Sequence, residues 1–199
     1  ERLKELDSRK EAVIKSIEEQ EKMTPELRQK IDFAVTMADL EDIYLPYRPK
    51  RRTRATIAKE KGLEPLALII MEQKLDDPVL KAEEFLNDDV KTVEEAISGA
   101  SDIIAEWISE DEKARKQLRY LFDKEAVIYS KVVKGKEAEG IKFSDYYNWS
   151  EPLKKCPSHR LLAMRRGEEE SFLRLSIEPD EDNALDMLTS IFLKGRNGS

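Results

Sequence analysis

The residues most suited to chemistry lie in a short basic stretch that follows two tyrosines, Tyr44 and Tyr47. Arginine and lysine contact phosphates and aromatic rings stack on bases, so this combination favours a nucleic-acid partner. The stretch over residues 48–54 carries five positive charges within seven residues. These charges repel one another, so the stability of the fold alone does not explain their clustering. The alternative is a solvated loop whose cations pair with nearby acids such as Glu41 and Asp42. The candidate nucleic-acid contacts are Arg48, Lys50, Arg51, Arg52, Arg54 and Lys59.

A helix-turn-helix pattern overlaps this stretch over residues 53–73. Such a motif packs a small residue of its first helix against the second, turns on a glycine and buries an apolar residue of the second helix. Ala58, Gly62 and Leu68 have the corresponding spacing. The pattern predicts two short helices that either contribute to nucleic-acid binding or serve only for packing.

A second basic region surrounds Gly135 and Gly140, which interrupt the helical pattern. It lacks the Gly-x-x-x-x-Gly-Lys-Ser/Thr spacing of phosphate loops, so nucleotide binding is rejected. The glycines would still let a partner approach the backbone. The candidate nucleic-acid contacts in this region are Lys134, Lys136, Arg165 and Arg166, and the alternative is an ordinary basic helix face.

Catalytic and metal chemistry finds little support in the sequence. Cys156 and His159 are the only cysteine and histidine, and nothing supplies a nucleophile, a base and an orienting group together. Ser158 is better used as a helix cap. The acidic run from Asp180 to Asn183 opens a predicted helix, where carboxylates offset the helix dipole. We therefore predict no enzyme activity, no metal and no cofactor.

The single cysteine excludes an internal disulfide and fits a reducing compartment. No stretch approaches the ~20 apolar residues of a membrane span, so we expect a cytoplasmic protein without membrane contact. The chain starts at Glu1 and ends in a linker-like run over residues 195–199, which predicts a piece of a longer protein.

Apolar residues recur at helical spacing through most of the chain. We expect helices over residues 2–22, 25–38, 57–61, 65–73, 93–109, 111–127, 158–166 and 182–193. The second of these starts at Thr24 as the cap and Pro25 as the first helical residue. Only residues 172–177 alternate like a strand. The predicted fold is mainly α, an elongated multi-helix domain with a helix-turn-helix-like segment and one short extended element near the C-terminal end. A helical region over 1–130 would be followed by a smaller, mostly helical segment over 131–199.

The charge of the chain is unevenly distributed. The formal net charge of −7 by itself argues against a nucleic-acid partner. Yet residues 48–61 carry +6 and residues 113–166 carry +8, with −11 over residues 76–112 between them. Electrostatic attraction acts over about 8–10 Å in physiological salt, so local charge can matter more than the total. The pattern leaves phosphate binding and internal charge pairing both open.

Several runs of this sequence resemble the bacterial Tex family. The longest, over residues 39–66, reads DLEDIYLPYRPKRRTRATIAKEKGLEPL and includes the basic stretch. Shorter runs lie at residues 131–140, 143–147, 150–153, 157–160 and 164–167. The resemblance covers essentially the whole chain.

The resemblance implies a large transcription accessory factor that is similar to a eukaryotic elongation factor. In this family a helical N-terminal region is followed by a RuvC-like fold, helix-hairpin-helix repeats and a C-terminal OB-fold RNA-binding domain. The chain would be a non-catalytic part of the N-terminal helical region, leading to the RuvC-like domain. Expected partners are RNA or DNA, bound through the full-length protein, other domains of the parent protein and the transcription machinery. The alternative is a structural scaffold for interdomain or protein–protein docking without direct nucleic-acid contact.

Overall fold

Threonines start four helices in the N-terminal part of the chain. In the computed structural model, which describes residues 2–74 and 77–193, each accepts a hydrogen bond from the backbone N–H three residues later. A side-chain oxygen in this position satisfies an N–H group that has no partner within the helix. The helices are α2 (Pro25–Phe33), α3 (Met37–Tyr44), α4 (Arg54–Glu60) and α7 (Val93–Glu110), capped by Thr24, Thr36, Thr53 and Thr92.

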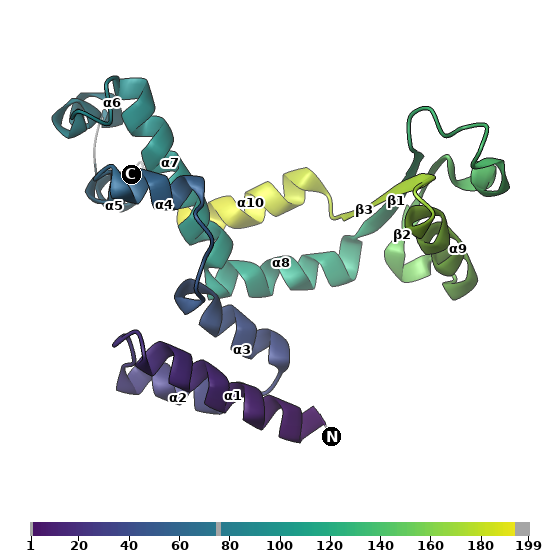
Figure 1. The fold of residues 1–199 in the computed structure, drawn as a ribbon, viewed down its shortest axis with the longest axis horizontal. Coiled ribbons are helices and arrows are strands. Elements are labelled where there is room, and N and C mark those ends of the chain that lie inside the picture. Colours follow the sequence, from purple (N-terminus) through teal and green to yellow (C-terminus); the bar gives the residue numbers. More distant parts are fainter. Residues whose placement is uncertain (1, 75–76, 194–199) are drawn as a thin grey trace, which may run out of the picture. The chain divides into compact units, whose positions relative to one another are not determined.

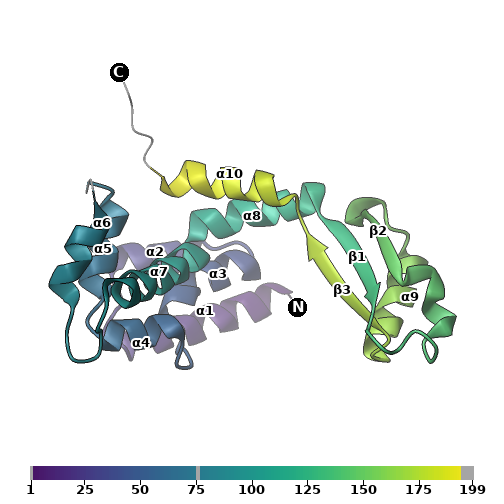
Figure 2. The ribbon, with the colours of Figure 1, turned by 90° about the horizontal axis from the view of Figure 1, so that it is seen from above.

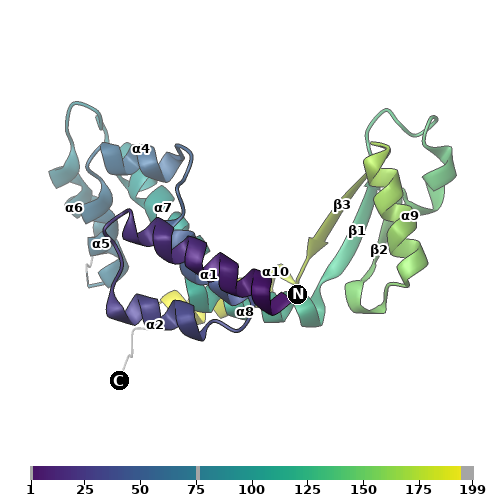
Figure 3. The ribbon, with the colours of Figure 1, turned by 60° about the horizontal axis from the view of Figure 1, so that its bottom comes forward.

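The apolar stripe over residues 27–38 is divided between α2 and α3 rather than forming one helix. The backbone of Ala34 is extended, with ψ 124°, and Thr36 caps the next helix. Helix α1 (Arg2–Glu18) packs against α2, which lies beside it in Figure 3, and also against α3. Their shared core contains Val13, Ile17, Ile31 and Leu40, each at most 1% exposed.

Helix α7 carries a second core cluster. The helices α4, α5 (Glu64–Glu72) and α6 (Pro78–Ala82) pack on it (Figure 1), and the 3-10 helix η2 (Glu83–Phe85) follows α6. The side chains that α7 contributes to this core are Ala96, Ala100 and Ile103. The helices expected over 57–61, 65–73 and 93–109 are thus confirmed, with ends that differ by a few residues.

The described residues form two compact units. The first is built from residues up to Lys116, and the second comprises Gln117–Phe192. Helix α8 (Glu112–Glu125) begins in the first unit and continues into the second. Residue 130, the boundary expected from the sequence, lies within the second unit. The tail over residues 195–199 lies outside the described residues.

The second unit contains a three-stranded antiparallel sheet with the order β2-β1-β3 (Figure 2). Its strands are β1 (Val127–Val132), β2 (Asn148–Pro152) and β3 (Leu173–Glu178). Helix α9 (Ser158–Glu169) packs on β3. The unit also contains the 3-10 helices η3 (Ile141–Tyr146) and η4 (Leu153–Lys155) and the helix α10 (Glu181–Phe192).

The chain is mainly helical, as predicted, and the extended element expected over 172–177 is β3. The sheet also contains β1 and β2, which the periodicity argument misses. The apolar residues that open β1 continue the pattern of the preceding helix, which ends at Glu125 and not at Val127. A strand alone would leave its backbone polar groups unpaired, and the ladder with β1 satisfies those of β3.

The cap expected at Ser158 is wrong. Helix α9 already includes Ser158, the N-cap position is occupied by Pro157, and no side chain accepts a hydrogen bond there. Proline, with its fixed φ, marks this start instead of a hydroxyl group.

Candidate nucleic-acid interface

The basic segment, residues 48–61, consists of a loop and helix α4. The loop follows the 3-10 helix η1 (Leu45–Tyr47), which contains Pro46. It ends in a capping box, in which Thr53 and Thr56 each accept a hydrogen bond from the backbone N–H of the other. The loop that carries the cations is therefore fixed at both ends by local structure.

Lys50 anchors this loop on α7. Its Nζ lies 2.8 Å from Oε1 of Glu106 and also pairs with Glu110, and the lysine side chain is only 26% exposed. Burial alone would lower the pKa of Lys50, but its hydrogen bonds to Glu106 and Glu110 outweigh burial and raise that pKa. Lys50 therefore stays charged and is already paired with two carboxylates.

Glu106 is the centre of this attachment. Besides Lys50, it accepts hydrogen bonds from Lys59 Nζ at 3.4 Å and from Thr53 Oγ1 at 3.2 Å. Its burial would raise its pKa, but the lysines outweigh burial and hold the pKa of Glu106 below its ordinary value.

Sequence reasoning missed Glu106, although its spacing carries a signal. Asp102, Glu106 and Glu110 recur every four residues, so they lie along one face of α7, and we call them the acidic stripe. All three pair with cations of the basic segment, including Asp102 with Arg54. The internal charge pairing considered from the sequence thus exists. Its acids belong to the acidic segment over residues 76–112, as the charge pattern allows, and not to Glu41 or Asp42.

The arginines of the loop remain accessible. Arg52 pairs with Glu60 at 2.8 Å and Arg54 with Asp102 at 3.5 Å, yet their side chains are 68% and 87% exposed. Arg48 and Arg51 are exposed, and neither forms an ion pair within the described part of the chain. The structure therefore separates the predicted contacts into two anchoring lysines and four exposed arginines.

The helix-turn-helix pattern corresponds to α4, a turn at Gly62 and α5. Gly62 has φ +81°, a left-handed conformation that glycine adopts without steric cost, and Ala58 is buried as expected. The burial expected for Leu68 is wrong, because Leu68 is 54% exposed and Leu66 and Ala67 point into the core instead.

The second helix of this pair is poorly suited to reading DNA. Helix α5 contains no lysine or arginine, and its exposed surface includes Glu64, Leu68 and Glu72. Carboxylates there would repel phosphates. The cations of the motif lie on α4 and on the loop before it, and not on the second helix, which would enter the groove in a DNA-binding helix-turn-helix.

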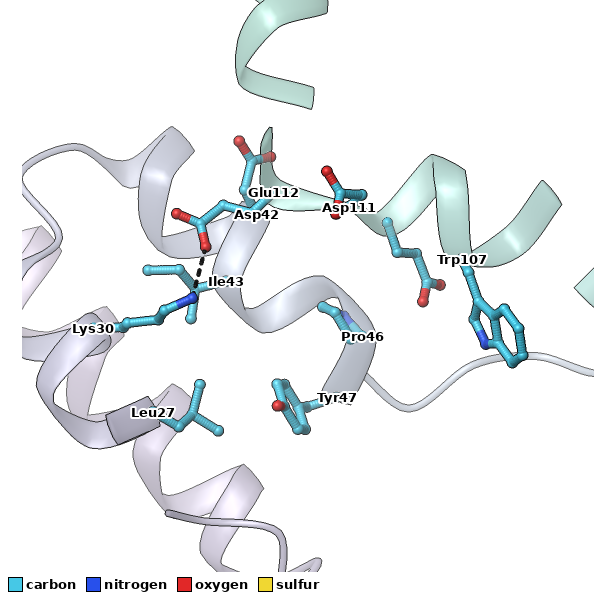
Figure 4. Close-up of a pocket in the computed structure, with 10 residues that line it drawn as sticks. Leu27, Lys30, Asp42, Ile43, Pro46, Tyr47, Trp107, Asp111 and Glu112 are labelled. Carbon is cyan, nitrogen blue, oxygen red and sulfur yellow. Dashed lines mark hydrogen bonds and ion pairs between the residues drawn. The ribbon is translucent and has the colours of Figure 1, made fainter. Parts of the chain in front are cut away.

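A cavity of about 260 Å³ in the first unit has an acidic lining (Figure 4). Leu27 and Trp107 give it apolar walls, and its carboxylates are those of Asp42, Glu110, Asp111 and Glu112. Three of these are paired with cations, Glu112 with Lys30 at 3.4 Å, Asp42 with Arg115 at 2.7 Å, and Glu110 with Lys50. Because its net lining charge is negative, this cavity is unsuited to an anionic ligand.

The predicted contacts of the second unit lie on two elements. Lys134 is exposed in the turn after β1, where Gly135 has φ +85°, and Lys136 pairs with Glu139 at 2.7 Å. On α9, Arg165 pairs with Glu168 and Arg166 with Glu170. Among the described residues, Lys134 is thus the member of this group that has no ion-pair partner.

The environment of Cys156 does not favour a nucleophile. Burial raises the pKa of its thiol, and the nearby carboxylate of Glu151 raises it further, so the reactive thiolate is disfavoured.

The acidic run that begins at Asp180 serves the start of α10. Asp180 accepts a hydrogen bond from the backbone N–H of Asn183, as expected of a helix start. The described residues contain no group of three or more side chains suited to hold a metal ion. Within the same residues, every helix is too short or too polar to cross a membrane.

Comparison with known proteins adds an independent line of evidence. The family model described as "Tex central region-like" matches residues 73–194. The transcriptional accessory protein Tex of Neisseria gonorrhoeae is 44% identical over 91% of this chain and 24% of its own length. The protein tex of Bordetella pertussis is 43% identical over 90% of the chain and 23% of its own length. The human S1 RNA-binding domain-containing protein 1 is 26% identical over 89% of the chain and 18% of its own length.

The chain spans about a quarter of the length of the bacterial relatives it matches. The family match covers more than half of the chain and includes the shorter runs that resemble Tex proteins, while the longest run, over residues 39–66, precedes it. It lies in the central region of the family, whereas the resemblance alone predicts the N-terminal helical region. The chain therefore belongs to the Tex family, and residues 73–194 correspond to the central region of that family.

Proposed function

We propose that this part of a Tex-like transcription accessory protein contributes to nucleic-acid binding through the exposed arginines of the basic segment. The observation that carries the proposal is the anchoring of Lys50 on the acidic stripe while the four arginines around it stay exposed. A loop that is already fixed loses less conformational freedom when a partner binds. Guanidinium groups also match phosphate oxygens bidentately.

The ion pairs of the arginines do not oppose this role. Exposed pairs such as Arg52 with Glu60 contribute only about 0–1 kcal/mol, so a phosphate can replace the carboxylate at little cost. Lys50 and Lys59 act in this proposal as anchors rather than as contacts. Lys134, Lys136, Arg165 and Arg166 would provide further phosphate contacts from the second unit.

The test is the salt dependence of binding of labelled RNA and DNA oligonucleotides to the 199-residue chain. Replacing Arg48, Arg51, Arg52 and Arg54 together by alanine should reduce the slope of log affinity against log salt. The expected reduction is about 0.7 per lost phosphate contact for a single strand. A matched control removes two exposed lysines of the first unit, as Lys15→Ala/Lys22→Ala, and should leave the slope unchanged. Equal slopes for the wild type and the arginine variant would refute the proposal.

A scaffold function is favoured by one separate observation. Phe33, the last residue of α2, and Val35, in the connection to α3, are 72% and 79% exposed. A partner that covered these two side chains would remove their apolar surface from water. A photo-crosslinker at position 33 of the full-length parent protein would test this function. Crosslinks to another domain or to a transcription protein would support it, and their absence would count against it.

A further inference from the structure

The register of the sheet separates its side chains into two faces. Residues directly opposite one another in antiparallel strands point to the same side, and successive residues alternate. Ile128 and Ser130 of β1 and Leu173 of β3 are at most 2% exposed, and α9 packs on β3. The other face belongs to the alternate residues of each strand, and Tyr129 lies at its centre.

This second face consists of three rows across the strands. The middle row places Tyr129 between Ser150 of β2 and Ser176 of β3. The next row towards the end of β1 is Asn148, Lys131 and Arg174, and the row at the start of β1 is Pro152, Val127 and Glu178. The face thus has one aromatic ring at its centre, a polar and cationic row on one side, and a single acid on the far side.

The groups on this face are accessible. Tyr129 is 36% exposed, and its hydroxyl makes no hydrogen bond within the described residues. Lys131 and Arg174 are both exposed, and within that same part of the chain neither has an ion-pair partner. This sets them apart from Arg160, Arg165 and Arg166, which are paired with carboxylates.

We propose that the Tyr129 face of the sheet binds a single-stranded nucleic acid, with a base stacked on the Tyr129 ring and backbone phosphates at Lys131 and Arg174. Serine side chains on both sides are small and leave the ring face open. The cationic row lies two residues along the strand, about 7 Å away, within reach of the phosphate next to a stacked base. Stacking platforms beside cationic tracks are the general solution for binding single strands.

The composition of the face argues against a protein partner. A protein-docking core is expected to be apolar and depleted in charge. This face carries one aromatic ring and two cations that have no ion-pair partner among the residues described. Lys134, in the turn that follows β1, extends the positive charge beyond the same end of the strand. This site lies in the second unit and does not depend on the basic segment of the first.

The test uses the whole chain with a short oligouridylate and the corresponding oligothymidylate as probes. Tyr129→Leu should weaken binding of at least one probe by about 5- to 150-fold, because stacking on an aromatic ring is lost. Tyr129→Phe retains the ring and should bind as the wild type does. Inorganic polyphosphate has no bases, so its binding should be the same for both variants.

A separate measurement, the salt dependence of binding, tests the two cations of the sheet face. Lys131→Ala/Arg174→Ala should lower the salt slope by about 1.4, for two phosphates of a single strand. Lys154→Ala/Lys155→Ala, a matched removal of two exposed cations on η4, should leave it unchanged. Fluorescence of Trp149, which lies on β2, shows whether each variant keeps the fold of the second unit.

The outcomes distinguish this site from the basic segment. The Tyr129→Leu effect should persist when Arg48, Arg51, Arg52 and Arg54 are all alanine. If that arginine variant binds as the wild type does while Tyr129→Leu weakens binding, the proposed function fails and the sheet site stands. If Tyr129→Leu binds both oligonucleotides as tightly as Tyr129→Phe, the sheet site is overturned and the face is left to a protein partner.

Discussion

The predicted cations of the two units pair with their acids differently. In the first unit, Lys50 and Lys59 reach Glu106 across 56 and 47 residues of sequence. In the second unit, several basic side chains pair with carboxylates only three or four residues away on the same short stretch: Lys136, Arg165 and Arg166. Both regions look alike in the sequence, as clusters of lysine and arginine.

The difference shows that the position of the acids decides what a basic cluster does. On α7 the acidic stripe lies under the loop, so the lysines connect two elements and become partly buried. Pairs within one helix turn stay exposed and contribute about 0.3–0.5 kcal/mol each. Long-range pairing therefore anchors a loop, whereas local pairing leaves the fold nearly independent of the cations.

The largest expected effect is at glycines where elements approach closely. A Cβ on Gly167 would lie 2.5 Å from Cδ1 and 2.8 Å from Cγ of Leu173, a side chain that is 2% exposed. Gly167→Ala should destabilise the second unit by about 1–3 kcal/mol through overpacking. A Cβ on Gly99 would lie 2.4 Å from Cδ1 of Leu63, a terminal methyl group. Gly99→Ala should cost less, because only that methyl group has to move, whereas at Gly167 the branch atom Cγ of Leu173 must move as well. The helix propensity that alanine gains is the same at both positions, which lie in α7 and α9.

Each unit contains one of the two tryptophans, so the units can be followed separately. Trp107 lies on α7 in the first unit and Trp149 on β2 in the second. Urea unfolding of the first unit would be recorded by Trp107 fluorescence in a Trp149→Phe background. Unfolding of the second unit would be recorded by Trp149 fluorescence in a Trp107→Phe background. A larger loss for Gly99→Ala than for Gly167→Ala would contradict the packing argument.

The next effect concerns the anchor of the basic loop. Glu106→Ala removes the acceptor of Lys50, Lys59 and Thr53 and should destabilise the first unit by about 1–2 kcal/mol. The matched control is Asp102→Ala in the same acidic stripe. Its partner Arg54 is 87% exposed, so the expected cost is below about 0.5 kcal/mol. Equal costs for the two variants would show that Glu106 does not anchor the loop.

The pH dependence sharpens the same comparison. The folded pKa of Glu106 lies below its ordinary value of 4.5, so its contribution to stability is present above that pH. As the pH falls through the folded pKa, Glu106 is protonated and the contribution is lost. The difference in unfolding free energy between the wild type and Glu106→Ala should therefore shrink as pH falls below about 4.5. A constant difference throughout this range would contradict the assignment of Glu106 as the charged hub.

Most of the helices could be predicted from the sequence because their boundaries are encoded locally. Thr24 and Pro25 start α2 through a cap and a fixed φ, and Gly62 provides the left-handed turn after α4. The sheet could not be predicted in the same way. β1 is recognised as a strand only by its ladders with β2 and β3, which come from later in the chain.

The candidate site was predictable in its residue types but not in their roles. Lys50 and Arg51 are neighbours in one basic run, and nothing local distinguishes them. The distinction arises because Glu106 and Glu110 meet Lys50 in the folded unit. In the same way, the opposition of Tyr129 with Ser150 and Ser176 depends on strand register, which local sequence does not determine.

The smallest expected effect is at a local pair of the second unit. Arg166 is 74% exposed and pairs with Glu170 at 3.2 Å. Lys142 lowers the pKa of Glu170 more than Arg166 does, and this lysine remains when the arginine is removed. Arg166→Ala should therefore change the stability of the second unit by less than about 0.5 kcal/mol, measured by Trp149 fluorescence. If Arg166 contacts phosphate, the same variant still lowers the salt slope of oligonucleotide binding by about 0.7. A stability loss above about 1 kcal/mol would mean that this local pair is structural, and the contrast between the two units would then fail.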